Sequence, residues 1–225
     1  GYWQFNEGYG SKATDRSRNR HMTLASENSW FVNAGTNYVA SLDGNTAILA
    51  STGVYTKSDE SYLIETWFRA DTENNGKATI LSIPNAVDIA LGESGNVEVT
   101  SEKVTTNAYN ANLKDGQWHH MALNVTKSTG GGATLYIDGV ARRQFSSKSI
   151  PNLTDGVIIL GGRYWGDGDE LKYEQFLKGN IDEVRVWKGR YTSDIINNNM
   201  RTRVENDAEG LAAYYPMESR ALDSY

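Results

Sequence analysis

The chain contains no cysteine, so disulfide frameworks, zinc–thiolate sites and thiol catalysis are excluded together. Proline is scarce, with 3 in 225 residues. No apolar run approaches the roughly 18 residues of a membrane-spanning helix, which excludes a span of that kind. Lysine and arginine total 22 against 28 acidic residues, and they form no basic stripe. Because nucleic-acid binding depends on clustered positive charge, we expect no nucleic-acid partner.

What the chain does contain is glycine, 22 residues of it, together with apolar residues that alternate with polar ones. A period of two is typical of strands, and glycine favours the short turns that join them. The pattern predicts an all-β fold, and we interpret residues 1–225 as one β-sandwich domain of a larger protein. Strands are predicted at residues 62–69, 78–83, 87–91, 97–99, 118–125, 133–137, 140–145, 157–160 and 181–187.

Two local signals stand out between the strands. Asp138–Gly139 predicts a two-residue type I′ hairpin, because both central residues of that turn need positive φ. One short helix is predicted near the C-terminus, where Thr192 or Ser193 can cap the first amides and Asp194 suits the positive end of the helix dipole. Its apolar face is expected to comprise Ile195, Ile196, Met200 and Val204.

Four stretches occur in the order in which a known family carries them. They are Trp3–Gly8 with Asp15–Asn19, Tyr62–Phe68, Trp118–Leu123 with Leu135–Gly139, and Gly179–Trp187. Together they resemble the laminin-G-like and pentraxin-like domains of the concanavalin A-like lectin/glucanase superfamily. The resemblance implies a jelly-roll sandwich of two curved antiparallel sheets, with a concave face that many relatives use to bind sugars. Residues 210–218 resemble relatives inside large surface proteins of Bacteroidetes-like bacteria, which implies an extracellular or cell-surface location.

One acidic segment has the spacing of a catalytic site. Sugar-hydrolysing relatives carry three carboxylates on one strand face, and Glu205, Asp207 and Glu209 have that spacing. The alternate positions, Asn206 and Ala208, lack the apolar character of a buried central strand. We therefore interpret this segment as a solvated acidic loop and expect no enzyme activity.

The histidines also argue against a catalytic or metal site. His119 and His120 are neighbours on a predicted strand, so their side chains point to opposite faces and cannot bind one metal ion from the same side. We expect both to be hydrogen-bonded within the sheet.

An oxygen-rich loop is the better candidate for a metal. Asp15, Ser17 and Asn19 alternate there, and Ca²⁺ prefers several oxygen ligands from a loop that wraps it. Relatives often hold a structural Ca²⁺ between an entry loop of this kind and the aspartate of their I-D-E-V strand. Carried over by position, the resemblance implies a Ca²⁺ site formed by Asp15, Asn19, Asp182 and Glu7.

The same residues are open to a second interpretation. Arg16 and Arg18 would place positive charge beside the ion, where relatives favour small residues. The loop could instead close as an Asx-turn without metal, with Asp182 paired to Arg185 or Arg190.

Aromatic residues in loops are candidates for sugar binding, because an exposed ring can stack on the apolar face of a pyranose. Residues 161–169 are predicted to form a glycine-framed turn that presents such a ring beside polar groups. The candidate ligand-binding residues are Arg163, Tyr164, Trp165 and Asp167. Trp165 could instead fold back onto the edge of the sandwich. The tryptophans on strands are expected in the core, namely Trp3, Trp67, Trp118 and Trp187.

These observations favour a non-catalytic carbohydrate-binding or adhesion module of a multidomain extracellular protein. We expect a monomeric domain whose partner is a glycan or a surface glycoprotein. A structural or protein-interaction spacer without glycan binding is the alternative, and a glycoside hydrolase is a remote third. Exposure of Trp165 separates the first two, because the spacer hypothesis predicts a buried indole.

Overall fold

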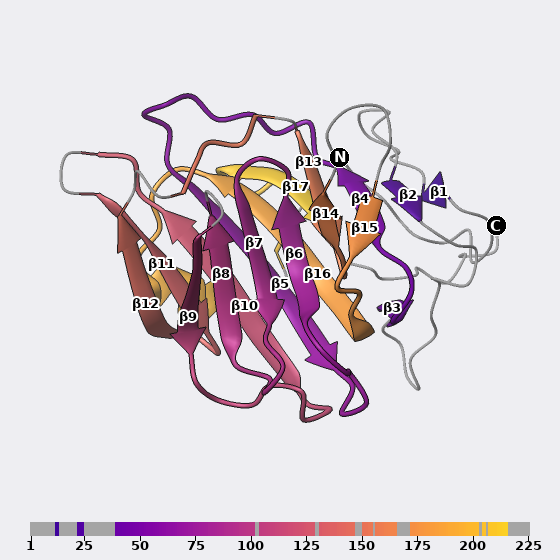
Figure 1. Ribbon diagram of the computed structural model, residues 1–225. Coiled ribbons are helices and arrows are strands. Elements are labelled where there is room, and N and C mark those ends of the chain that lie inside the picture. The colour runs from indigo at the N-terminus through magenta and orange to yellow at the C-terminus, as the bar shows by residue number, and fades with distance from the viewer. Residues whose placement is uncertain are drawn as a thin grey trace.

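Two large antiparallel sheets pack face to face (Figure 1). The computed structural model describes residues 12–13, 22–24, 39–101, 104–128, 131–146, 150–154, 156–165, 172–202, 204–205 and 207–215. The predicted all-β class is confirmed: the molecule is a jelly-roll sandwich with a short helix near its C-terminus.

The described strands fall into two sheets and a ribbon. The eight-stranded sheet has the spatial order β1 (Lys12–Ala13), β2 (Met22–Leu24), β4 (Ile48–Ser51), β13 (Val157–Leu160), β6 (Ala78–Ile83), β7 (Val87–Leu91), β8 (Val97–Ser101) and β9 (Val104–Tyr109). The seven-stranded sheet has the order β12 (Val140–Ser146), β11 (Gly132–Ile137), β10 (Trp118–Val125), β5 (Tyr62–Ala70), β16 (Lys178–Lys188) and β17 (Leu211–Tyr215), with β3 (Ala40–Asp43) also paired to β16. The ribbon consists of β14 (Arg163–Trp165) and β15 (Lys172–Glu174), and the helix α1 spans Ser193–Asn199.

Alternation along the strands builds the core between the sheets. Ile64 and Phe68 of β5 and Ile89 and Leu91 of β7 are fully buried in that core. Each such side chain contributes roughly 1.5–3 kcal/mol of hydrophobic stabilisation. Asp88, between the inward positions of β7, points to the opposite side and remains partly exposed. Each sheet therefore has an inner apolar face and an outer face whose composition is free to differ.

The predicted strands are all present, with small shifts at their ends. Asp138 (φ 53°) and Gly139 (φ 75°) form the predicted hairpin turn between β11 and β12. Strand β9 is not predicted, because exposed residues such as Thr105 and Asn107 give it no clear apolar alternation. The stretch Trp3–Gly8 lies outside the described residues.

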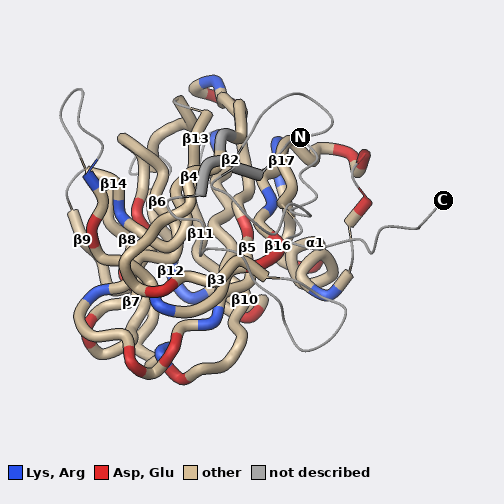
Figure 2. Tube along the Cα trace, turned by 90° about the vertical axis from the view of Figure 1, so that its right-hand side faces the viewer, with Lys and Arg blue, Asp and Glu red and all other residues tan. Residues whose placement is uncertain are grey.

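Helix α1 covers the outer face of the seven-stranded sheet, on the side away from β6–β9 (Figure 2). The Thr192 hydroxyl accepts a hydrogen bond from the amide of Ile195, which confirms the predicted N-cap. Ile196 is fully buried, and Met200 and Val204 are each 8% exposed. The prediction that Ile195 belongs to this face is wrong, since its side chain is 40% exposed. A step of one residue turns a helix by about 100°, which directs Ile195 away from the sheet.

The tryptophans on strands require a correction. Trp187 is buried, but it lies beneath α1 with Leu63 and Ile196 and not between the two sheets. Trp67 alternates with the inward Phe68, is half-buried on the same outer face, and donates from Nε1 to the carbonyl of Met200 at 3.2 Å. Trp118 is also half-buried, and Trp3 lies outside the described residues.

A buried arginine joins this outer face to the end of the helix. The side chain of Arg185 on β16 is 3% exposed. Its Nη1 lies 3.5 Å from Oε1 of Glu65 on β5 and donates to the Asn199 carbonyl at 2.7 Å. Its Nη2 contacts the Glu183 carboxylate and donates to the Thr202 carbonyl at 3.2 Å. The guanidinium thus binds the carbonyl of Asn199, one of those that a helix leaves without an intrahelical partner at its C-terminus, and the carbonyl of Thr202 just beyond it.

Glu65 is the buried anion of this cluster, with a side chain that is 1% exposed. Its Oε1 accepts a hydrogen bond from Trp187 Nε1 at 2.9 Å, and its Oε2 lies 3.4 Å from Nε2 of the buried His120. Glu183, the other carboxylate of Arg185, accepts a hydrogen bond from the Tyr214 hydroxyl at 2.9 Å. Residues from β5, β16 and β17 therefore meet in one hydrogen-bonded network under α1, and His120 of β10 lies beside it.

His119 points to the other side of β10 and braces the hairpin, as predicted for hydrogen-bonded strand histidines. Its Nδ1 lies 2.9 Å from Oδ2 of Asp138, and its Nε2 lies 3.3 Å from Asp115. The hydrogen bond to Asp138 raises the pKa of His119 above its ordinary value, although burial opposes the shift. Burial opposes the shift of Asp138 too, but hydrogen bonds from His119 and the His120 amide lower the pKa of that carboxyl.

We expect Arg185→Met to lower the free energy of unfolding by about 3–5 kcal/mol, because it leaves Glu65 buried without its cation. Urea denaturation measures this change. Lys188→Met is the matched control on the same strand, since Lys188 pairs with Glu60 at 3.3 Å and its side chain is 39% exposed. The control should cost less than about 1 kcal/mol. Equal losses of unfolding free energy in the two variants would contradict the prediction that the buried cluster contributes more to stability than the exposed pair.

The His119–Asp138 pair predicts a pH-dependent stability. The raised pKa of His119 stabilises the fold below its unfolded value and the benefit disappears as pH rises through the folded value. The lowered pKa of Asp138 stabilises above its unfolded value and the benefit disappears as pH falls through the folded value. The pair therefore contributes most between about pH 4 and pH 6.5.

His119→Gln tests this pair. The difference in unfolding free energy between the parent protein and the variant should be larger at pH 6 than at pH 9. Asp138→Asn, which keeps a residue that tolerates positive φ, should flatten the same profile. A pH-independent difference for His119→Gln would show that the pair does not titrate with folding.

Candidate functional site

The outer face of the eight-stranded sheet carries polar side chains at the positions that alternate with the core. Asp88 on β7 pairs in register with Thr100 on β8, which pairs with Thr105 on β9. Ala90 and Glu98 form the neighbouring cross-strand pair. Adjacent strands lie about 4.8 Å apart, so these side chains form two short rows that cross the strands.

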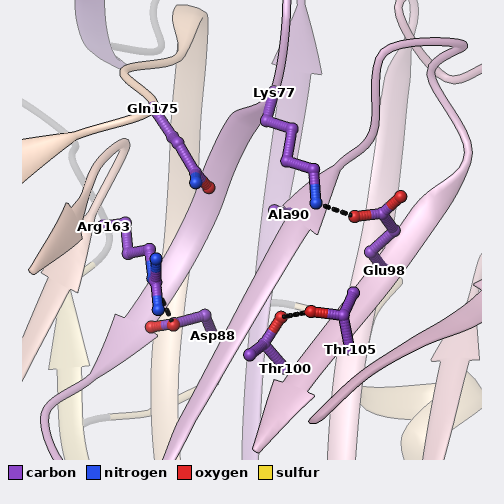
Figure 3. A pocket seen from close by; sticks show the side chains of 8 residues that line it. All are labelled: Lys77, Asp88, Ala90, Glu98, Thr100, Thr105, Arg163 and Gln175. Atoms are coloured by element: carbon purple, nitrogen blue, oxygen red, sulfur yellow. Dashed lines mark hydrogen bonds and ion pairs between the residues drawn. The ribbon is translucent and has the colours of Figure 1, made fainter. Parts of the chain in front are cut away.

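A cavity of about 260 Å³ lies over these rows (Figure 3). It is lined by Lys77, Asp88, Ala90, Glu98, Thr100, Thr105, Arg163 and Gln175. The floor comes from β7, β8 and β9, whereas Lys77 precedes β6 and Arg163 and Gln175 come from the ribbon and the residue after it. The lining is therefore polar and is drawn from segments far apart in sequence.

Arg163 is held at one side of the cavity by two carboxylates. Its Nε donates to Oδ2 of Asp88 at 2.8 Å, and its Nη1 donates to Oε1 of Glu174 at 2.9 Å. The buried hydroxyl of Ser82 donates to Oδ1 of Asp88 at 2.6 Å. Burial opposes the charge on Arg163, but the hydrogen bonds to both carboxylates raise its pKa. Arg163 is a fixed cation in a fixed position.

The other side of the cavity is organised in the same manner. Nζ of Lys77 lies 2.6 Å from Oε2 of Glu98. The hydroxyls of Thr100 and Thr105 hydrogen-bond each other at 2.9 Å. Gln175, whose backbone has a positive φ of 54°, stands between these groups and the ribbon. The cavity thus offers hydroxyl, amide and charged groups that can bind a ligand rich in hydroxyl groups.

Two glycines direct the chain from the sheet into the ribbon. Gly161 has a φ of 71°, and a Cβ at that position would lie 2.2 Å from Cδ1 of Leu42. A Cβ at Gly162 would lie 2.7 Å from the Cβ of Ala47. The backbone passes this close to core residues as it leaves β13, and that approach fixes where β14 begins.

Arg163 and Trp165 lie on the same face of the ribbon. They are two residues apart on β14, and their register partners on β15 are Glu174 and Lys172. The Trp165 side chain is 49% exposed, and Nζ of Lys172 lies 5.6 Å from the centre of its ring system. The exposed indole is therefore on the side of the ribbon that turns Arg163 toward the cavity.

The other candidate residues lie elsewhere. Tyr164 projects to the opposite face of the ribbon, where its ring meets that of Tyr173 edge-on at 6.1 Å. Asp167 lies outside the described residues. Residues 163–165 form a strand and not the predicted turn, because they pair with β15. The structure thus places Arg163 and Trp165 together and separates Tyr164 from them.

The acidic segment near the C-terminus has the predicted character. Glu205, Asp207 and Glu209 are exposed, and the Ala208 amide donates to the Glu205 carbonyl in a turn. These carboxylates do not alternate on a buried strand. They are exposed to solvent, whereas the catalytic acid of a glycosidase lies in apolar surroundings.

The structure describes one of the four predicted calcium ligands. Oδ1 of Asp182 accepts a hydrogen bond from the Glu183 amide at 2.8 Å, where a bulge interrupts the pairing of β16 with β5. Glu7, Asp15 and Asn19 lie outside the described residues. Within the described part of the chain, no three histidine or acidic residues cluster closely enough to hold a metal ion. The calcium site stays a prediction.

The predictions from sequence do not include most of the cavity residues. Asp88 and Glu98 occupy the polar positions of two apolar strands, Val87–Leu91 and Val97–Ser101, and that parity places them on the outer face. Many polar residues share this signal, however. Their convergence with Lys77 depends on the strand order, which alternation alone does not specify.

Acidic and basic residues are interspersed along the described chain, and no single-sign block stands out (Figure 2). The described helix α1 is far too short and polar to cross a bilayer.

Comparisons with known proteins agree with the architecture. The sequence profile of the concanavalin A-like lectin/glucanases superfamily matches residues 35–197. A candidate carbohydrate-binding protein of Bacteroides ovatus superposes with a TM-score of 0.63 at 22% identity, over 84% of this chain and 54% of its own. Domain 4 of AbnA, an extracellular arabinanase of Geobacillus stearothermophilus solved with arabinotriose, superposes with a TM-score of 0.57 at 18% identity. The match covers 87% of this chain and 95% of that domain. The ligand-binding domain of botulinum neurotoxin serotype D, solved with N-acetylneuraminic acid, superposes with a TM-score of 0.55 at 13% identity. The match covers 88% of this chain and 51% of that structure.

The chain spans about half the length of the Bacteroides and neurotoxin structures and nearly all of the arabinanase domain. No curated protein matches the sequence. At these identities the structural likeness establishes the fold alone. The profile covers most of the sequence, and on that basis the chain belongs to the concanavalin A-like lectin/glucanases superfamily.

Proposed function

We propose that this protein is a non-catalytic carbohydrate-binding module of an extracellular or cell-surface protein. One observation carries the proposal: the exposed Trp165 shares a ribbon face with Arg163, which lines a polar cavity on an open sheet face. Sugar sites combine an aromatic plane for the apolar side of a ring with a few oriented polar groups for its hydroxyls.

The size of the cavity suits a ligand that is partly enclosed. About 260 Å³ is just below the roughly 300 Å³ at which pockets for drug-sized molecules begin. We infer that the cavity receives one sugar unit while Trp165 contacts the next part of the glycan. The solved neighbours include domains bound to arabinotriose and to N-acetylneuraminic acid, which supports the general class of ligand.

The spacer alternative is disfavoured by the same indole. A spacer without ligand would be expected to bury Trp165, whereas half of its surface faces solvent. Large exposed aromatic groups beside a polar cavity are typical of binding sites.

The absence of catalysis is part of the proposal. The two floor carboxylates, Asp88 and Glu98, are each engaged by a cation at 2.8 and 2.6 Å. A glycosidase needs one carboxyl in apolar surroundings to act as the acid. Incubation with oligosaccharides that bind should therefore release no reducing ends.

Trp165→Ala should weaken glycan binding at least about tenfold, equivalent to about 1.4 kcal/mol, because the stacking surface is lost. A glycan array identifies the ligand, and isothermal titration of the parent protein and the variant measures the change. Trp165→Phe, which keeps an aromatic plane, should retain most of the affinity.

Ile195→Ala is the control, since Ile195 is also an exposed apolar residue but lies on α1 against the other sheet. It should bind as the parent protein does. An array without hits, or hits that survive Trp165→Ala, would refute carbohydrate binding at this site.

We also propose a structural Ca²⁺ held by Asp15, Asn19 and Asp182, with Glu7 as a further ligand. An ion bound only by the folded state stabilises it by mass action. Millimolar Ca²⁺ should raise the Tm relative to excess chelator by about 2–4 °C for each kcal/mol gained. Asp182→Asn should remove the calcium-dependent rise. Equal Tm values for the parent protein in calcium and in chelator would exclude the site.

A further inference from the structure

We propose that the cavity selects uncharged sugars and disfavours acidic ones such as uronates and sialates. This inference rests on the proposed carbohydrate-binding function and specifies the ligand of that same site. It follows from how the two cations of the cavity are engaged.

Both cations already have carboxylate partners from the protein. Lys77 pairs with Glu98 at 2.6 Å, and Arg163 pairs with Asp88 at 2.8 Å and with Glu174 at 2.9 Å (Figure 3). A sugar carboxylate can reach either cation only at a donor that lies next to one of these protein carboxylates. The sugar carboxylate and the protein carboxylate would then lie side by side, and like charges at close range repel.

The carboxylate partner of Arg163 is itself immobilised. Oδ1 of Asp88 accepts a hydrogen bond from Ser82, whose side chain is fully buried, while Oδ2 accepts one from Arg163. Asp88 cannot turn away without breaking both bonds. The exchange of Asp88 for a ligand carboxylate is therefore costly.

The charges of the lining balance without any ligand. Lys77 and Arg163 offset Asp88 and Glu98, and Glu174 adds one negative charge behind Arg163. The ammonium of Lys114 also lies in the field of Glu98, but it donates to the carbonyls of Gly76 and Glu93 and does not line the cavity. Each positive charge among the described lining residues is already paired with a carboxylate of the protein.

A sugar hydroxyl, by contrast, fits the lining without placing a second negative charge beside Glu98 or Asp88. A carboxylate offers about four lone-pair positions, and each ion pair at the cavity uses only some of them. A hydroxyl can donate to the remaining positions on Glu98 or Asp88 and accept from Lys77 or a threonine hydroxyl. Binding of this kind adds no net charge and should depend little on salt.

The test begins with a glycan array that carries neutral, uronate-containing and sialate-containing oligosaccharides. Affinities are then measured for galactotriose and trigalacturonate, a pair that differs in the oxidation of C6, and for the best array ligand. The parent protein should bind the neutral class at least about tenfold more tightly than its acidic counterparts, with little change when the NaCl concentration rises.

Glu98→Gln should release Lys77 and raise the affinity for the acidic member about five- to tenfold, in a manner that salt suppresses. Glu60→Gln is the matched control, because it removes a carboxylate from the exposed pair with Lys188 and changes the net charge by the same amount. It should behave as the parent protein does. Lys77→Gln, a second variant at a partly exposed residue, should strengthen the neutral preference, because it leaves Glu98 without its cation.

The outcomes separate the two levels of the proposal. A parent protein that binds no glycan overturns carbohydrate binding and this inference together. Acidic ligands that bind best, in a manner that depends on Trp165, leave carbohydrate binding intact and overturn the neutral selectivity. An unchanged preference in a folded Glu98→Gln protein, or a preference for the acidic member in Lys77→Gln, also overturns it.

Discussion

The buried guanidinium of Arg185 is the contact on which the arrangement of the outer faces depends. It joins Glu65 of β5 and Glu183 of β16 to the carbonyls of Asn199 and Thr202 at the end of the helix. A planar group with five donors can serve four partners, which a lysine cannot do. Because the charges are already desolvated, displacement of the helix would leave buried ions and carbonyls without partners. The helix is therefore held against the seven-stranded sheet.

As a result, the outer face of one sheet is covered by the helix, whereas that of the other sheet stays partly open. On the seven-stranded sheet, α1 covers an outer face that buries apolar side chains beside the Arg185 cluster, whereas the eight-stranded sheet receives the β14–β15 ribbon at one side. Thr79 and Ser82 are fully buried near the ribbon and hydrogen-bond to Gln175 and Asp88. Farther across the sheet, Thr105 is exposed. The burial of outward side chains therefore decreases from the ribbon toward the edge strand β9, which leaves a polar site that is enclosed on one side only.

The sequence predicted those features that depend on local pattern. Alternation identified strands such as Tyr62–Ala70, and the need for positive φ identified the Asp138–Gly139 turn. Parity within a strand does not say which sheet face a helix will cover, so Trp187 was expected in the wrong layer. The cavity could not be predicted for a similar reason: the approach of Lys77 to Glu98 follows from strand order, a non-local property. Strands and turns were therefore predictable from the sequence, whereas the meeting of distant residues at the cavity was not.

Ion pairs occur on both outer faces, and burial decides what each can do. The Glu65–Arg185 pair is almost wholly buried, so removal of either partner leaves a desolvated charge without its counter-ion. The integrity of the pair therefore affects the stability of the fold. The side chains of Lys77 and Glu98 are 39% and 19% exposed. Exposed pairs of this kind contribute only about 0–1 kcal/mol to stability. The same chemistry is therefore structural under the helix and adjustable at the cavity, where a change of partner can alter ligand choice while the sandwich remains folded.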